Sequence, residues 1–169
     1  MLLYHSNNSI MKKMTTSKSG LQLIKDYEGL RLRAYLCPAG VWTIGFGHTK
    51  GVRQGQVITE EQACNYLVED VAPIERLLNV LGVNFRQEQF DALVSWIFNL
   101  GSGNFQHSTL LRKIMADASD EEICTEIVRW VNSNGKPLTG LKKRRIAEAN
   151  MFAGYELYYL DKNNNIKHK

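Results

Sequence analysis

The sequence contains few cysteines, and they are poorly placed for structural roles. Its three cysteines, Cys37, Cys64 and Cys124, form no Cys-x-x-Cys pair and do not cluster with the four histidines. Disulfide frameworks and structural zinc sites need such groupings. We therefore expect reduced thiols and no bound metal.

Long apolar runs are also missing. No run reaches the roughly 18 apolar residues that a membrane-spanning helix needs, so we expect no stable membrane insertion. The first 19 residues lack the apolar stretch of a signal peptide, from which we expect a protein that is made and kept in the cytoplasm.

The composition is that of a folded domain with an excess of positive charge. The chain has 169 residues, of which 44% are hydrophobic, which suffices for one domain or for one domain in two lobes. The net charge of +4 suits an anionic polymer, such as nucleic acid, a membrane surface or bacterial cell wall. Nucleic acid is the weakest of these partners, because no basic array with interleaved aromatic residues is present.

The order of polar and apolar residues divides the chain into three parts. Residues 1–16 are expected to form a flexible N-terminal extension, and residues 17–160 a single domain. Residues 161–169, rich in asparagine and lysine, are expected to remain a solvated polar tail.

Helix signals recur through most of the domain. Ser17 or Ser19 can cap a helix that ends at Gly29, which places Glu28 in its last turn. A capping box of Thr59 and Gln62 predicts a long helix, which Pro73 should bend or split. Further helices are predicted at residues 86–100, 108–116, 120–131 and 139–153.

The only predicted β region covers residues 31–48, where apolar residues alternate around glycine-containing turns. The C-terminal half is expected to be entirely helical. Together these features predict an α+β, mostly helical protein with a small β-hairpin lobe, a long connecting helix, a larger helical lobe and a cleft between the lobes.

Eight residues separate Glu28 from Cys37 and five separate Cys37 from Thr43, and Gly45–Thr49 follows at once. This pattern resembles that of the bacteriophage lysozymes, the endolysins of glycoside hydrolase family 24, which have Glu, then Asp or Cys, then Thr at these spacings. The resemblance extends over roughly residues 19–155 through three further blocks: Phe98–Gly101, Ser108–Leu111, and Trp130 followed by Gly140–Arg145 and Glu148.

The resemblance implies roles for the three spaced residues. Glu28 would deliver a proton to the leaving oxygen of a glycosidic bond. Cys37 stands where the family more often has Asp and would activate the attacking water, as the second group does in an inverting glycosidase. Thr43 would help to place that water. On residue type alone, Cys37 is equally a small buried hydrophobe and Thr43 an ordinary strand residue.

Five further residues are candidates for substrate binding: His48, Phe98, Asn99, Gly101 and Phe105. For His48 a supporting contact at the lobe edge is the stronger interpretation, and for the segment from Phe98 to Phe105 a helix end with core aromatics is the alternative. Trp96 and Trp130 are predicted to be core residues. Lys142–Arg145 is predicted to be a solvated helix face.

The resemblance implies a monomeric muramidase without a cofactor, which hydrolyses the β-1,4 bond between N-acetylmuramic acid and N-acetylglucosamine in peptidoglycan. It would lyse the host and release phage, and a holin would give it access to the wall. Two alternatives remain open. One is a lytic transglycosylase, in which the muramyl 6-hydroxyl replaces water because a thiol is a poor base. The other is an inactive wall-binding module.

Overall fold

The computed structural model describes residues 13–169. The expected extension of residues 1–16 therefore lies mostly outside the described residues. Its last part contacts the long helix: the Met14 amide donates to Asn79 Oδ1 at 2.8 Å, and the Thr16 amide donates to Glu75 Oε1 at 2.8 Å. These residues thus lead into the domain along its surface.

The first helix, α1 (Lys18–Glu28), begins and ends as predicted. The Ser17 hydroxyl accepts a hydrogen bond from the Gly20 amide, and Gly29 terminates the helix with a φ of 71°. Ser17 is itself held by Asp91, whose carboxylate accepts from its amide at 2.9 Å and also from its hydroxyl. Asp91 is buried, and a Cβ on Gly20 would lie 2.7 Å from its Cγ. The start of α1 is therefore fixed closely against the helix that carries Asp91.

The β lobe follows α1 and confirms the predicted β region. Strands β1 (Arg31–Leu36) and β2 (Trp42–Gly45) pair antiparallel, with Tyr35 opposite Thr43. Ile44 of β2 is fully buried. Gly45 lies against Ala63, since a Cβ at Gly45 would be 3.3 Å from the Ala63 Cβ, so the hairpin sits directly on the helix that follows.

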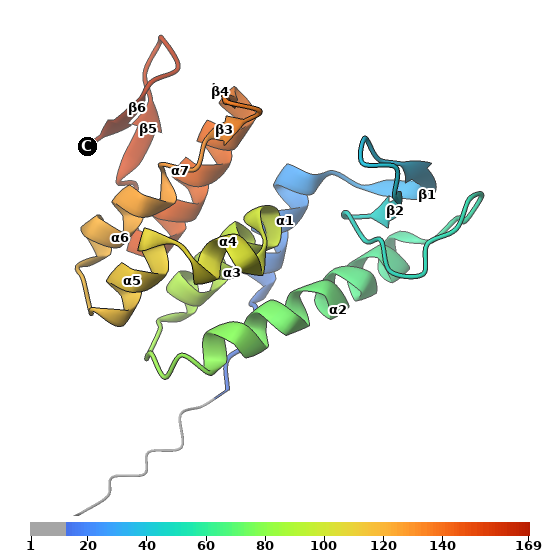
Figure 1. Ribbon diagram of the computed structural model, residues 1–169, viewed down its shortest axis with the longest axis horizontal. Helices are drawn as coiled ribbons and strands as arrows, with labels where there is room; N and C mark the ends of the chain where they lie inside the picture. Colours follow the sequence, from blue (N-terminus) through green and yellow to red (C-terminus); the bar gives the residue numbers. More distant parts are fainter. Residues whose placement is uncertain (1–12) are drawn as a thin grey trace, which may run out of the picture.

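That helix, α2 (Glu60–Asn79), extends from the β lobe to the helical lobe, as Figure 1 shows. The predicted capping box of Thr59 and Gln62 is present. Of the two effects predicted for Pro73, a bend or a split, the split does not occur. Proline removes one backbone hydrogen bond, but the buried side chains Val71 and Ile74 on either side hold α2 continuous.

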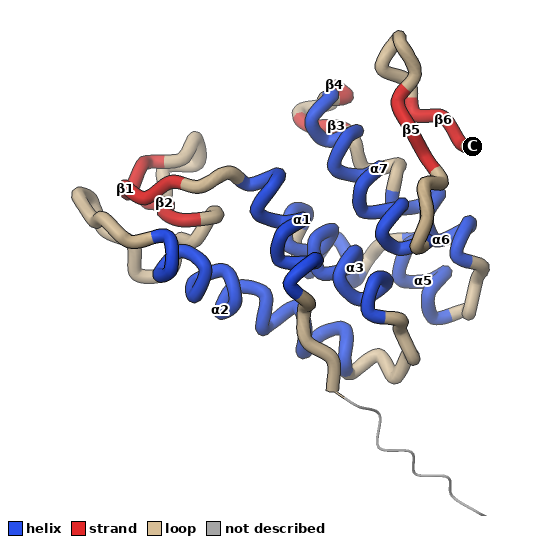
Figure 2. The backbone as a smooth tube through the Cα atoms, turned by 180° about the vertical axis from the view of Figure 1, so that it is seen from behind, coloured by secondary structure: helices blue, strands red, loops and turns tan. Residues whose placement is uncertain are grey.

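The remaining helices form the larger lobe around α3 (Gln87–Leu100), whose residues from Gln89 to Ile97 are all buried. They are α4 (Ser102–Gln106), α5 (Thr109–Met115), α6 (Asp120–Ile127) and α7 (Thr139–Ala153). The pair of α3 with α7 makes the largest helix contact, and the pairs of α1 with α3 and of α6 with α7 come next. Figure 2 shows the same helices from behind, with the β lobe set apart from them.

The C-terminal half is not entirely helical. The predicted helix at 120–131 ends at Ile127, and two short hairpins follow, β3 (Asn132–Ser133) with β4 (Lys136–Pro137) and β5 (Tyr158–Leu160) with β6 (Ile166–His168). Asn134 and Gly135 both have positive φ, the conformation of a tight hairpin turn. The Asn-Gly pair was thus a turn signal that the helical interpretation overlooked.

The expected polar tail is also part of a hairpin. Residues 161–169 are mostly exposed, as predicted, but the Asp161 carboxylate accepts hydrogen bonds from the Asn163 and Asn165 amides and closes the turn between β5 and β6. The domain therefore extends past residue 160. Within the described residues, no helix has the length and apolar character needed to cross a membrane.

Candidate active site

A cleft of about 430 Å³ lies between the two lobes. It is lined by Glu28, Gly47, Thr49, Asp70, Pro73, Ile74, Ile97, Phe98, Asn99, Gly101 and Ser102. The cleft thus brings four of the predicted site residues together: Glu28 at the end of α1 and Phe98, Asn99 and Gly101 at the end of α3. A carboxylate, an amide, an aromatic ring and exposed backbone are a suitable lining for a sugar polymer.

Glu28 occupies the cleft with its carboxylate held at one oxygen. Its Oε1 accepts a hydrogen bond from Arg144 Nη1 at 2.6 Å, and 22% of its side chain is exposed. The other oxygen, Oε2, is directed toward Gly47, because a Cβ built there would lie 3.9 Å from it. Gly47 has a φ of +95°, a conformation that favours glycine. The second oxygen therefore remains available at the cleft wall.

Arg144 is a buried residue that fixes Glu28 against the helical lobe. Its side chain is 3% exposed, and it also donates from Nε to Glu148 Oε1 at 3.1 Å and from Nη2 to the Ser95 carbonyl at 3.3 Å. A guanidinium presents its donors in one rigid plane. Arg144 is thereby held by α3 and α7 while it holds the carboxylate of α1.

Glu148 lies at the centre of this network and is fully buried. It accepts a hydrogen bond from the Ser95 hydroxyl at 2.7 Å and forms an ion pair with Arg145, whose Nε lies 3.0 Å from Oε2 without pointing at it. Burial raises the pKa of Glu148, against the opposing effect of Arg145 and Arg144. Burial likewise lowers the pKa of Arg145, to about 10, against the opposing effect of Glu148.

The network reaches the cleft again at Asn99. Arg145 Nη2 donates to Asn99 Oδ1 at 2.7 Å, and this bond fixes the orientation of the Asn99 side-chain amide. The amide nitrogen of Asn99 then points away from Arg145 as a hydrogen-bond donor. The prediction that Lys142–Arg145 is a solvated face is therefore wrong for Arg144 and Arg145, which are buried. Their spacing to Glu148, four and three residues along α7, is that of helical ion pairs and was the signal that could have identified them.

Cys37 and Thr43 lie on the β hairpin rather than in the cleft lining. Cys37 follows β1, and hydrogen bonds from the Val41 and Ala39 backbone amides and from the Thr43 side chain lower the pKa of its thiol. The Thr43 hydroxyl is buried and lies 3.0 Å from the Val41 carbonyl. Its single proton therefore has two acceptors, that carbonyl and the Cys37 sulfur, and donation to sulfur favours the thiolate.

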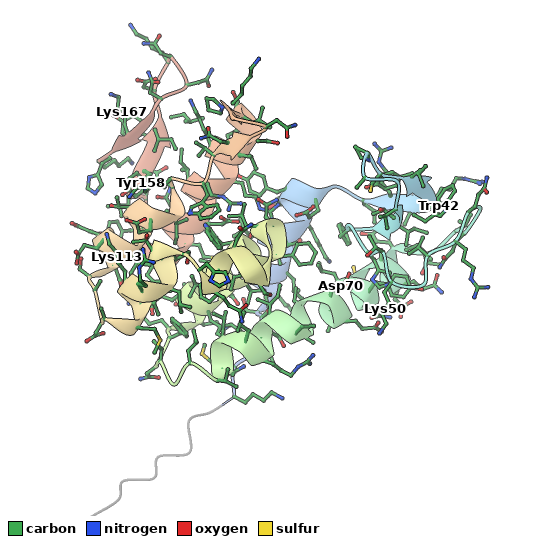
Figure 3. All side chains as sticks on the ribbon, in the orientation of Figure 1. Trp42, Lys50, Asp70, Lys113, Tyr158 and Lys167 are labelled. Atoms are coloured by element: carbon green, nitrogen blue, oxygen red, sulfur yellow. The ribbon has the colours of Figure 1, made fainter. Side chains whose placement is uncertain are left out.

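His48 has a structural position, in line with the stronger of its two interpretations, and its candidate role in substrate binding is corrected. It is buried, and its ring stacks on Tyr66. Its Nδ1 lies 2.9 Å from both Asp70 carboxylate oxygens, and its Nε2 lies 2.9 Å from the Lys50 carbonyl oxygen. Both ring nitrogens are thus engaged, and His48 joins the β lobe to α2. Figure 3 shows Asp70 on α2 near the boundary between the lobes. Asp70 also lines the cleft and was not predicted.

Phe105 is a core residue, and its assignment to substrate binding is also corrected. It is fully buried on α4, and its ring packs edge-on against Trp96 with a centroid distance of 6.1 Å. Trp96 is fully buried, and Trp130 packs against it at 5.3 Å, so both tryptophans belong to the interior as predicted. Among residues 13–169, no three His, Cys, Asp or Glu side chains gather where they could hold a metal ion.

A two-lobed, mostly helical fold with a carboxylate presented at the cleft between its lobes defines the lysozyme class of glycan hydrolases. Comparison with known sequences gives the family: the phage lysozyme profile matches residues 25–148, and the chain belongs to the phage lysozyme family. It is a lysozyme-type peptidoglycan hydrolase.

Two endolysins and one solved structure illustrate the relationship. The chain is 48% identical over 145 residues to the endolysin of Acyrthosiphon pisum secondary endosymbiont phage 1, with 82% of this chain and 98% of that protein covered. It is 40% identical over 143 residues to the endolysin of Bacillus phage B103, with 82% of this chain but only 54% of that longer protein covered. The muramidase domain of SpmX from Asticaccaulis excentricus is 38% identical with a TM-score of 0.77, covering 82% of this chain and 97% of that domain.

Proposed function

We propose that the enzyme hydrolyses the β-1,4 bond between N-acetylmuramic acid and N-acetylglucosamine. The observation that carries the proposal is the position of Glu28, whose carboxylate lies at the interlobe cleft with one oxygen bound by Arg144 and the other toward the cleft wall. A related domain of the same fold is described as a muramidase. Glycosidases of this kind need a carboxylic acid at the scissile bond.

In this proposal Glu28 donates the proton to the leaving oxygen. Because Arg144 occupies Oε1, the transferable proton would reside on Oε2, the oxygen directed toward Gly47. As that bond breaks, a water molecule attacks the anomeric carbon and gives its proton to the Cys37 thiolate. The amide donors around Cys37 and the Thr43 side chain support this role, since they lower the pKa of the thiol and increase the thiolate fraction near neutral pH.

Analysis of the products of digested, purified peptidoglycan tests the proposal. Hydrolysis should give fragments with free reducing N-acetylmuramic acid ends. Fragments with 1,6-anhydro ends would instead identify a lytic transglycosylase, and wall binding without any cleavage would identify an inactive module. Either of these results would contradict the proposed reaction.

We further propose that the enzyme accumulates in the host cytoplasm and reaches the wall after a holin has permeabilised the membrane. The family assignment supports this proposal, since the related phage proteins are endolysins. Expression without a holin should leave cells intact until the membrane is permeabilised with chloroform. Lysis before that step would refute holin dependence.

A further inference from the structure

Two nucleophilic side chains, Lys25 and Cys64, meet outside the cleft. Lys25 Nζ donates a hydrogen bond to Cys64 Sγ at 3.0 Å, and the same Nζ lies 5.4 Å from the centre of the Phe46 ring. Neither residue lines the cleft. Both side chains are partly exposed, so small oxidants can reach them.

The contact joins the two lobes. Lys25 lies on α1, which packs against α3 and α7 of the helical lobe. Cys64 lies near the start of α2, next to Ala63, which supports Gly45 of β2. Figures 1 and 2 both show α2 extending from one lobe to the other. A covalent bond between Lys25 and Cys64 would therefore tie the β lobe to α1.

We propose that Lys25 and Cys64 form an oxidative modification site, at which hydrogen peroxide joins Nζ to Sγ through a single oxygen atom. One peroxide oxidises the thiol to a sulfenic acid and is reduced to water. A second peroxide removes one hydrogen from the sulfenic oxygen and one from Nζ as the oxygen–nitrogen bond forms, and it leaves as two waters. Overall, an amine, a thiol and two peroxides give an N–O–S bridge and three waters.

The separation of the two atoms favours this bridge. At 3.0 Å, Nζ and Sγ are already close to the span of one intervening oxygen, whereas a direct sulfur–nitrogen bond would require them to approach to little more than half that distance. The hydrogen bond and the Phe46 ring hold the amine over the sulfur, so the reacting groups are oriented before oxidation.

The other two thiols have different surroundings. Cys124 is fully buried, its Sγ lies 3.3 Å from the Ala149 carbonyl, and burial raises its pKa to about 12, which disfavours the reactive thiolate. Cys37 is surrounded by backbone amides and Thr43 rather than by an amine. The cross-link should therefore be confined to Cys64.

Mass spectrometry of the whole chain after peroxide treatment tests the proposal. Non-reducing digestion should yield the Lys25 and Cys64 peptides as a linked pair whose mass is that of both peptides plus one oxygen minus two hydrogens. Dithiothreitol should separate them. Interlobe linkage should also raise the melting temperature of the treated protein relative to the same sample after reduction.

Two variants serve as controls. Lys25→Arg keeps a positive charge beside the sulfur but removes the amine, and Cys64→Ser removes the thiol, so neither should give the linked pair. Oxidation of Cys64 to sulfinic or sulfonic acid with Lys25 unmodified would overturn the proposal. A linked pair that loses two hydrogens without gaining oxygen, or a link to Cys37, would overturn it equally.

Discussion

Arg144 offers the sharpest test of how the active site is built. Replacing it with Met removes the guanidinium that binds Glu28, Glu148 and the Ser95 carbonyl, and leaves a chain of similar length in the same space. The two carboxylates and two guanidiniums of the network balance in charge. After the replacement, Glu28 has lost its ion-pair partner, and the fully buried Glu148 keeps only Arg145.

The expected loss of stability follows from that burial. Removing one partner of a buried ion pair costs about 3–5 kcal/mol, because the other charge stays desolvated. For a domain of this size, each kcal/mol lowers the melting temperature by roughly 2–4 °C, so Arg144→Met should melt roughly 6–20 °C lower. Cleavage should fall even at temperatures where the variant is folded, because Glu28 loses the donor that orients it.

Thermal and urea unfolding followed by circular dichroism measure the loss of stability, and the turbidity loss of a peptidoglycan suspension measures cleavage. Arg129→Met is the matched control, since Arg129 is 68% exposed and its contact with Glu126 is 3.3 Å. Arg129 is exposed, and the buried Glu126 keeps a second partner, Lys113 Nζ at 3.2 Å, so this variant should lose no more than about 1 kcal/mol. A loss below about 1 kcal/mol in Arg144→Met, or full cleavage activity, would refute the reasoning.

Three further predictions concern single residues. Glu28→Gln should retain the fold but lose about 4 kcal/mol of transition-state stabilisation, roughly a thousandfold in rate, because the amide carries no acidic proton; an active variant in the turbidity assay would remove Glu28 from the mechanism. Cys37→Asp should be active, Cys37→Ala should be strongly impaired, and iodoacetamide should inhibit the parent enzyme but not Cys37→Asp. The rate at which iodoacetamide alkylates Cys37 should rise at lower pH than for an ordinary thiol, because the hydrogen bonds that lower the pKa of Cys37 favour the thiolate. Full activity in Cys37→Ala would end the idea of a catalytic thiol. Phe105→Ala should cost about 3–5 kcal/mol in unfolding by urea without a specific loss of substrate affinity, because the ring fills the core; unchanged stability would contradict that placement.

Local signals in the sequence were sufficient for most helix boundaries. The caps at Ser17 and Thr59 act between neighbouring residues, so their effect is visible in the sequence and recurs in the structure. Pro73 does not split α2 as one of the two predicted effects would have it, because its local cost is outweighed by the burial of residues around it. The Asn134–Gly135 turn was visible but was given too little weight beside a helical context.

The candidate site was predictable only where it depends on residue spacing. Glu28 and Asn99 were identified, and both line the cleft. Asp70, Ser95 and Glu148 were missed or left without a role, because their importance depends on contacts between α2, α3 and α7 that no local pattern specifies. His48 and Phe105 were named as candidates for substrate binding for the same reason. The type of a polar or aromatic residue near a motif does not show whether its side chain faces the cleft or the interior of the protein.

The anchoring of α1 at Asp91 has a mechanical consequence for the chemistry at its opposite end. A methyl group on Gly20 would meet the Asp91 side chain at 2.7 Å, so either that side chain or helix α1 would have to shift. Glu28 lies eight positions after Gly20, about 12 Å along a helix, so a tilt of α1 by about 5° would move Glu28 by roughly 1 Å. Displacements of that size are enough to slow an enzyme about a hundredfold. The close packing of Gly20 at the start of α1 therefore helps to set the position of the Glu28 carboxylate at its end.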